Sequence, residues 1–132
     1  MKKQLSRNRK YYGIDTGMRS AVSFRFSEDS GLLLENFVWT ELRRLGCYLY
    51  WWLGHHECDF IVVDRGQVVK AIQVCWYLSD ENREREFGGV REVLDQFSGC
   101  EGYILTRNQE EMPSGRLQVI PVWKWILQGA NG

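Results

Sequence analysis

Residues 57–77, ECDFIVVDRGQVVKAIQVCWY, decide the fold that the sequence predicts. Two runs rich in valine and isoleucine, Glu57–Asp64 and Gln67–Tyr77, flank the pair Arg65-Gly66. β-Branched residues favour strands, and a glycine between two such runs is typical of a hairpin turn. The stretch therefore predicts two antiparallel strands joined by a tight turn.

The segment before this hairpin predicts a helix and one more strand. Apolar residues recur at helical spacing through residues 32–45, and Gly46 is placed to end the helix. The run Cys47–Leu53 follows with strand composition, and Gly54-His55-His56 separates it from the hairpin. The expected order is thus a helix followed by a meander of three strands.

The segment after the hairpin predicts a second helix and two strands. Ser79 is the expected N-cap of a helix that ends at Gly99, and its Gly88-Gly89 pair should either break it or let it pack closely. Strands are expected at 102–106 and 118–122, with the EEMPSG segment as a loop and 123–127 as a short helix or strand extension. A helix between the third and fourth strands permits a parallel crossover. We expect an α/β fold with a mixed sheet flanked by helices.

The charge distribution divides the 132 residues into a leader and one domain. Residues 1–10 carry five bases and no acid, whereas residues 11–132 carry 12 bases against 17 acids. A net charge of minus five beyond the leader is the wrong sign for a general phosphate-binding surface. We expect residues 11–132 to form a single domain, and residues 1–10 to be a linker or a local DNA contact.

The cysteines and apolar runs favour a cytoplasmic protein without membrane segments. Four cysteines lie far apart and form no C-x-x-C pair. The apolar stretches are much shorter than the roughly 20 residues that cross a bilayer. We expect reduced cysteines that pack in the core.

Five segments together resemble a known family. They are YYGIDTGMR, GLLLENFVWTELRR, ECDFIVV, AIQVCW and VIPVWKW, and the resemblance as a whole spans Tyr11 to Leu127. They resemble the uncharacterised C-terminal domain found on many bacterial and archaeal AAA-type ATPases. That domain is similar in fold to the PD-(D/E)xK nucleases, so the resemblance implies a restriction-endonuclease-like core with helix-strand-strand-strand-helix-strand order.

The resemblance implies a partly altered nuclease site. In the superfamily, a helix glutamate, a second-strand aspartate and a third-strand acid-x-lysine pair hold Mg²⁺ and orient a water. Glu35 and Asp59 match the first two positions, but Gln73 and Cys75 stand where the second acid and the lysine would be. Glu35 and Asp59, with the carbonyl oxygen of Gln73, could still ligate Mg²⁺ with weaker affinity. Neutral Cys75 cannot replace the positive charge of lysine.

The length of the hairpin loop decides whether Asp59 and Gln73 share a face. A three-residue loop, Arg65-Gly66-Gln67, pairs Asp64 with Val68 and sets Asp59 opposite Gln73. A two-residue loop shifts the register by one residue and turns the two side chains to opposite faces.

Three basic residues are candidates to replace the missing lysine. Lys70 lies on the third strand with the opposite parity to Gln73 and should face away from the site. Arg83 and Arg85 of the second helix could reach it.

Other conspicuous residues have simpler interpretations. His55-His56 is expected to form a solvated turn, because adjacent histidines cannot easily bind one metal ion. Residues 84–86 (Glu-Arg-Glu) are expected to form a solvated helix face, and the tryptophans at 51, 52, 123 and 125 are assigned to packing.

The sequence leaves three functional hypotheses. No G-x-x-x-x-G-K-[ST] motif occurs, so the chain is not itself the ATPase. The preferred hypothesis is a degenerate nuclease-like module that works beside an AAA-type ATPase domain and binds DNA or a protein partner. The alternatives are an active Mg²⁺-dependent DNA nuclease that uses Glu35, Asp59 and Gln73, and a structural or oligomerisation domain. The oligomeric state stays open.

Overall fold

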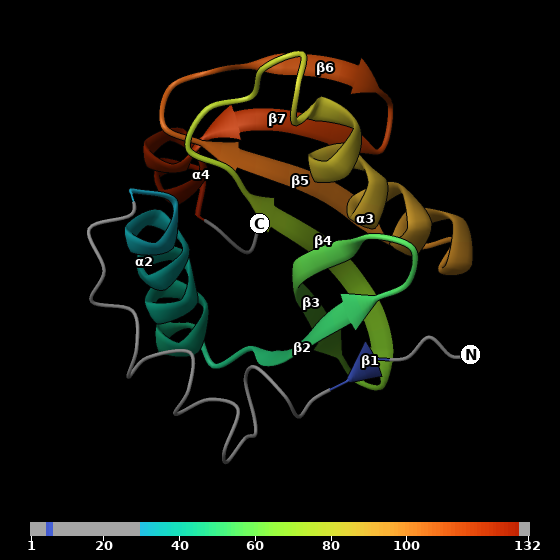
Figure 1. Ribbon diagram of the computed structural model, residues 1–132. Coiled ribbons are helices and arrows are strands. Elements are labelled where there is room, and N and C mark those ends of the chain that lie inside the picture. Colours follow the sequence, from blue (N-terminus) through green and yellow to red (C-terminus); the bar gives the residue numbers. More distant parts are fainter. Residues whose placement is uncertain (1–4, 7–29, 130–132) are drawn as a thin grey trace.

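The structure is a computed structural model that describes residues 5–6 and 30–129. It has an α/β architecture in which a seven-stranded mixed sheet is flanked by helices (Figure 1). The strand order is β1-β2-β3-β4-β5-β7-β6. Most of the predicted basic leader and the YYGIDTG segment lie outside the described residues. None of the described helices combines the length and apolar character needed to cross a membrane.

Helix α2 (Ser30–Arg44) forms where the apolar spacing predicts it. Val38 and Leu42 are fully or almost fully buried on its inner face. The helix ends because Gly46 adopts a φ of 81°, a left-handed conformation that glycine tolerates without steric cost. The chain then turns directly into the sheet.

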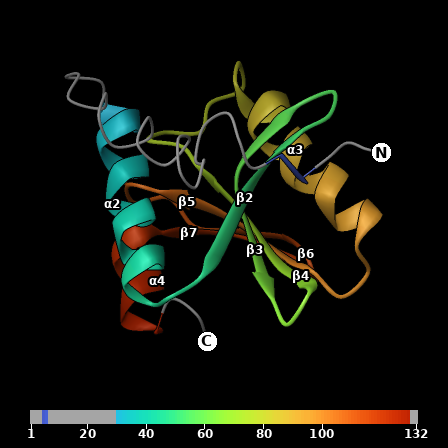
Figure 2. The ribbon, with the colours of Figure 1, turned by 90° about the horizontal axis from the view of Figure 1, so that it is seen from below.

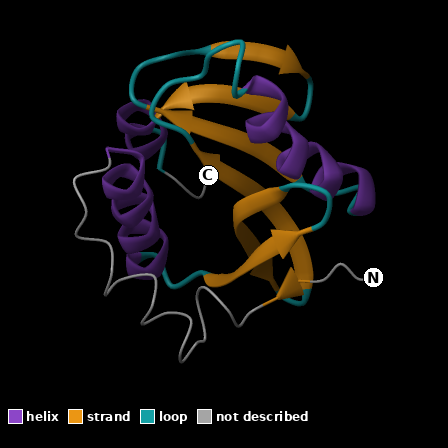
Figure 3. Cartoon of the chain, viewed as in Figure 1, coloured by secondary structure: helices purple, strands orange, loops and turns teal. Residues whose placement is uncertain are grey.

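The predicted meander is present as three antiparallel strands (Figure 3). They are β2 (Tyr48–Leu53), β3 (Glu57–Asp64) and β4 (Gln67–Val74). The two-residue strand β1 (Leu5–Ser6) pairs with β2 at the edge of the sheet. Strand β4 ends three residues earlier than the expected Tyr77, so residues 75–77 belong to the connection toward the next helix.

Helix α3 (Arg83–Gln96) begins later than the sequence predicts. Its N-cap is Asn82, and the prediction that Ser79 is the N-cap is wrong. The backbone N–H of Ser79 donates to Oδ1 of Asn82, and the N–H of Asn82 donates to Oγ of Ser79. This reciprocal pair has the pattern of a capping box, so Ser79 caps the turn at residues 80–82 that leads into the helix.

The second half of the sheet follows α3. Strand β5 (Glu101–Thr106) pairs in parallel with β4, as the predicted crossover requires, and also in parallel with β7 (Leu117–Pro121). Strand β6 (Glu111–Ser114) pairs antiparallel with β7, so the EEMPSG segment forms an edge strand and was wrongly predicted to be a loop. The described chain ends with the short helix α4 (Val122–Leu127).

The helices cover opposite faces of the sheet, and Figure 2 shows α2 and α4 on one side and α3 on the other. One core packs between the sheet and α2 and α4, and the second packs between the sheet and α3. Consecutive Trp51 and Trp52 are buried in different cores, as strand alternation requires. Packing is therefore the role of these two residues and of buried Trp125, whereas Trp123 is exposed.

Helix α3 approaches β3 closely at Gly89. A Cβ atom at this position would lie 1.9 Å from the carbonyl oxygen of Glu57. The sequence predicts either a helix break or close packing at Gly88 and Gly89. The helix continues through both residues, so close packing is correct. This approach sets the distance between α3 and the strand that carries Asp59.

We expect Gly89→Ala to lower the free energy of unfolding by about 3 kcal/mol, because the new methyl group clashes with rigid backbone. Gly99→Ala is the matched control, since a Cβ there meets nothing within 4 Å, and it should change stability by less than about 1 kcal/mol. Urea denaturation followed by circular dichroism measures both. Equal stability of the two variants would contradict the close approach.

Candidate functional site

One pocket collects the residues that the sequence predicts for a site. It lies where β4 ends, and helix α2, strand β3 and helix α3 also contribute to its wall. All four predicted residues line it, namely Glu35, Asp59, Gln73 and Cys75. An acid of the first helix and an acid of the meander, Glu35 and Asp59, thus border the same space.

The hairpin turn is the shorter of the two alternatives. Asp64 pairs with Gln67, so the loop contains only Arg65 and Gly66. Both loop residues adopt positive φ, 56° and 77°. Such a two-residue turn matches the twist of the flanking strands, which favours it over a longer loop.

A register shift further along the hairpin restores the predicted pairing. Val63 lies opposite Val68 but Val62 lies opposite Lys70, which leaves Val69 as an extra residue on β4. Beyond the shift Phe60 pairs with Ile72. A β-bulge thus compensates for the shorter loop, and Asp59 comes to lie beside Gln73.

A second register shift surrounds Asp59. Tyr50 pairs with Ile61 and Trp52 with Cys58, so a single β2 residue lies opposite both Asp59 and Phe60. Bulges often bend a strand next to a functional site and re-aim a side chain. Here β3 bends at the residue that the resemblance singles out.

Hydrogen bonds fix the orientation of Asp59. Its backbone N–H donates to Oε1 of Gln73 at 2.9 Å. Its carboxylate oxygen Oδ2 accepts from the backbone N–H of Val74 at 3.0 Å. The aspartate is buried and held from both ends, so its carboxylate has a defined position at the end of β4.

A second buried carboxylate comes from α3. Nε2 of Gln73 donates to Oε1 of Glu86 at 2.7 Å, and Glu86 is only 6% exposed. Oε2 of Glu86 pairs with Arg85 at 2.8 Å. Helix α3 therefore supplies a second acid, Glu86, which lies beside Gln73, the strand position where the superfamily has an acid and this chain does not.

Sequence reasoning missed Glu86. The prediction that residues 84–86 form a solvated face is wrong for this residue, although Glu84 and Arg85 are exposed. Glu86 precedes buried Val90 and Val93 by four and seven residues, which is the spacing of one helix face. That spacing was the available signal, and the charge pattern Glu-Arg-Glu obscured it.

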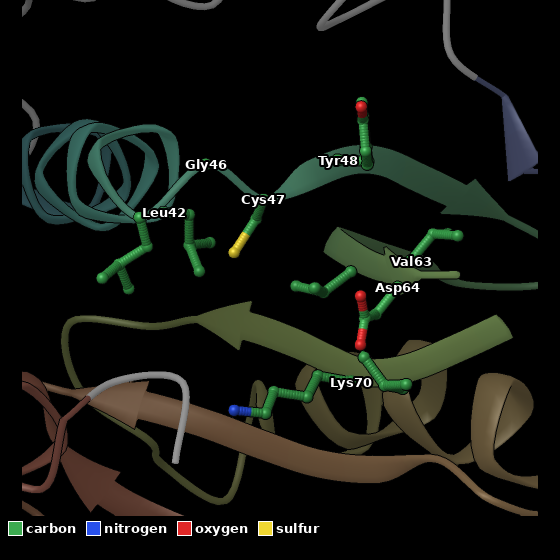
Figure 4. Close-up of a pocket in the computed structure, with 10 residues that line it drawn as sticks. Leu42, Gly46, Cys47, Tyr48, Val63, Asp64 and Lys70 are labelled. Carbon is green, nitrogen blue, oxygen red and sulfur yellow. The ribbon is translucent and has the colours of Figure 1, made fainter. Parts of the chain in front are cut away.

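Of the three basic residues considered as replacements for the missing lysine, only Arg85 lines the pocket. Arg85 lines the pocket, whereas Arg83 pairs with Glu111 of β6. Lys70 lies in a separate pocket with Cys47 and Asp64, on the face covered by α2 (Figure 4). Lys70 faces away from Gln73 as predicted, and burial lowers its pKa.

Cys75 contributes a neutral thiol to the pocket wall. Burial, and to a smaller extent the nearby Glu86 carboxylate, raise its pKa to about 11 against the opposing effects of neighbouring donors. The thiol is therefore protonated at neutral pH, as expected from the sequence. All four cysteines are free, without disulfide bonds.

The carboxylates surround the pocket without converging on one point. Glu35 lines the pocket from α2, whereas Asp59 and Glu86 are joined through Gln73. Within residues 5–6 and 30–129 there is no preformed group of three or more His, Cys, Asp or Glu side chains at metal-binding distance.

The His55-His56 turn is held by Glu92 of α3. Oε2 of Glu92 lies 2.8 Å from Nδ1 of His56, and Oε1 accepts from the indole N–H of Trp52 at 3.0 Å. Burial alone would raise the pKa of Glu92, but hydrogen bonds from Trp52 and His56 hold it below its usual value. The prediction of a solvated turn holds for exposed His55, whereas partly buried His56 helps to anchor α3 to the sheet.

A comparison with known proteins finds a similar protein, but the name of that protein does not state an activity. An uncharacterized protein of Methanocaldococcus jannaschii is 32% identical over 132 aligned residues. The match covers 89% of this chain but 29% of that protein, so the chain spans less than a third of its relative's length. No family model and no solved structure matches the chain.

We expect Gln73→Leu to lower the free energy of unfolding by about 2 kcal/mol or more, because a buried oxygen of Glu86 and the N–H of Asp59 lose their partner. Glu86→Gln is the matched variant, since its amide oxygen can still accept from Gln73. Its lost pair with exposed Arg85 should cost at most about 1 kcal/mol. Chemical denaturation of the two variants at neutral pH measures the difference, and a larger loss for Glu86→Gln would contradict the bridging role of Gln73.

Proposed function

We propose that this chain is a nuclease-like domain with a restriction-endonuclease-like core that works beside an AAA-type ATPase domain. The order of α2, the meander β2–β4, α3 and the parallel strand β5 supports this core. The chain spans 29% of its Methanocaldococcus relative, which supports a role within a longer protein.

We further propose that the pocket is a working site for Mg²⁺-dependent phosphodiester cleavage, not a degenerate one. The observation that carries this proposal is Glu86, a second buried carboxylate that shares the pocket with Asp59. Mg²⁺ prefers hard oxygen ligands and is commonly held by one or two carboxylates together with waters and substrate phosphate. Asp59 and Glu86 meet that requirement, and Glu35 adds a third carboxylate across the pocket.

The donor atoms of these residues fit a hard cation. Each carboxylate oxygen can accept two hydrogen bonds or ligands, so a carboxylate that accepts a hydrogen bond from Val74 or Gln73 can also ligate a cation. The carbonyl oxygen of Gln73 already accepts from Asp59, so we assign Gln73 to positioning the two acids and not to ligation. Bound Mg²⁺ would polarise the phosphate and lower the pKa of a water molecule.

Arg85 is our candidate for the positive charge that the lysine provides in the superfamily. Its side chain is 69% exposed, and its guanidinium borders the pocket beside Glu86. Guanidinium groups bind phosphate oxygens through paired hydrogen bonds. An exposed arginine can turn from Glu86 toward a phosphodiester, where its charge would stabilise the additional negative charge of the transition state.

Binding without cleavage is the second candidate function. The closed chain of contacts from Asp59 through Gln73 and Glu86 to Arg85 favours it, because every member is already paired. In that case the domain would bind DNA or a protein partner for the neighbouring ATPase domain.

Nicking of supercoiled plasmid DNA in Mg²⁺ or Mn²⁺ tests the proposed cleavage. We expect Asp59→Asn and Glu86→Gln each to lower the nicking rate by roughly 100-fold or more, because a bound cation contributes several kcal/mol to catalysis. Glu84→Gln is the matched control, since Glu84 is exposed on the same helix and undergoes the same chemical change.

Nicking that depends on the cation and survives only in the wild type and Glu84→Gln supports the nuclease. If all four proteins nick DNA equally, the activity comes from a contaminant and the proposed site is wrong. If the wild type binds DNA but does not nick it, the binding function replaces the nuclease.

A further inference from the structure

Two exposed aromatic side chains line the same pocket as the acids. Trp76 is 38% exposed and Tyr77 is 61% exposed, and both border the pocket together with Glu35, Asp59 and Glu86. Large aromatic rings are usually buried, and exposed ones beside a polar pocket indicate a binding surface. Neither residue belongs to the cores that hold the fold together.

The backbone beneath these rings is pinned in place. Nδ2 of Asn82 donates to the carbonyl oxygen of Tyr77 at 3.0 Å. The amide of Gln109 binds both backbone groups of Leu78, accepting at 2.6 Å and donating at 3.0 Å. The exposure of the rings is therefore a property of an ordered segment, and little ordering cost remains for a ligand that stacks on them.

Arginines border this aromatic surface. The guanidinium of Arg107 lies 5.2 Å from the centroid of the Trp76 ring. Arg85 lines the same pocket as the two aromatic residues. Aromatic rings combined with nearby cations are the features that bind single-stranded nucleic acids, since bases stack on the rings and phosphates approach the cations.

We propose that the pocket takes a single-stranded segment of DNA, with an unpaired base stacked on Trp76 or Tyr77 and the adjoining phosphate placed over Asp59 and Glu86. This inference rests on the proposed cleavage site and names its substrate class. A paired base has both faces covered by its neighbours in the duplex, whereas an unpaired base can offer a face to the protein. The aromatic surface therefore selects single strands over duplex.

The acids make this binding dependent on a divalent cation. Among the residues that the structure describes, four carboxylates line the pocket, those of Glu35, Glu57, Asp59 and Glu86, against one guanidinium, that of Arg85. They repel phosphate until a cation compensates their charge. Ca²⁺ can compensate the charge of the carboxylates without adopting the strict octahedral geometry of Mg²⁺. In Ca²⁺ the binding of DNA can therefore be measured separately from its cleavage.

Fluorescence anisotropy of a labelled thymine-rich single strand tests the inference, with the matching duplex as competitor and Ca²⁺ present. We expect the wild type to bind the single strand at least about 10-fold more tightly than the duplex. Trp76→Ala and Tyr77→Ala should each weaken binding by roughly 5- to 100-fold, the range typical of one lost base stack.

Tyr48→Ala is the matched control, because Tyr48 is 71% exposed and lines a different pocket, the one that contains Lys70. It should leave the affinity unchanged. Equal losses in Trp76→Ala, Tyr77→Ala and Tyr48→Ala, or equal affinity for single strand and duplex, would overturn the inference. Circular dichroism of each variant verifies that the fold is retained.

Calorimetric titration of the protein with Mn²⁺ alone separates this inference from the function on which it rests. If the wild type binds Mn²⁺, Asp59→Asn abolishes that binding, and the wild type shows no preference for single-stranded DNA, the inference is wrong but the proposed cleavage site is retained. If the single strand binds without any cation and the binding is lost in Trp76→Ala and Tyr77→Ala, stacking on the rings is retained, but the proposed cleavage site and the placement of the phosphate over Asp59 and Glu86 are both wrong.

Discussion

The hydrogen bonds of the Gln73 side chain are the interaction on which the site depends. One amide joins the backbone of β3 at Asp59 to the buried Glu86 of α3, at 2.9 Å and 2.7 Å. It does so only because α3 lies against β3, where Gly89 has no side chain to obstruct the approach. Two acids far apart in the sequence thereby come to share one pocket.

Sequence patterns were sufficient for most of the fold. The apolar spacing of α2, the valine-rich strands of the meander and the crossover to β5 all reflect local rules of periodicity and composition. The alternation of Trp51 and Trp52 between two cores follows from the same rules. What these patterns did not predict is edge strand β6, whose Pro113 and Gly115 are typical of a loop.

The site was predictable only in part, because its geometry depends on register and on long-range packing. A three-residue turn alone would have brought Asp59 opposite Gln73, whereas the two residues meet through a shorter turn and an extra residue, Val69. Two compensating changes of this kind leave no local signal. Glu86 did have a local signal, its helical spacing from Val90. That spacing predicts only that Glu86 lies on the buried face of the helix, and its role becomes clear only from its hydrogen bond with Gln73.

If Asp59 and Glu86 together bind a divalent cation, crystals grown with Mn²⁺ should show the ion by anomalous diffraction. We expect a strong anomalous peak within about 2.0–2.5 Å of a carboxylate oxygen of each residue. A fully occupied peak elsewhere, for instance beside His56 and Glu92, or no peak at all in this pocket, would show that the two acids do not form a cation site.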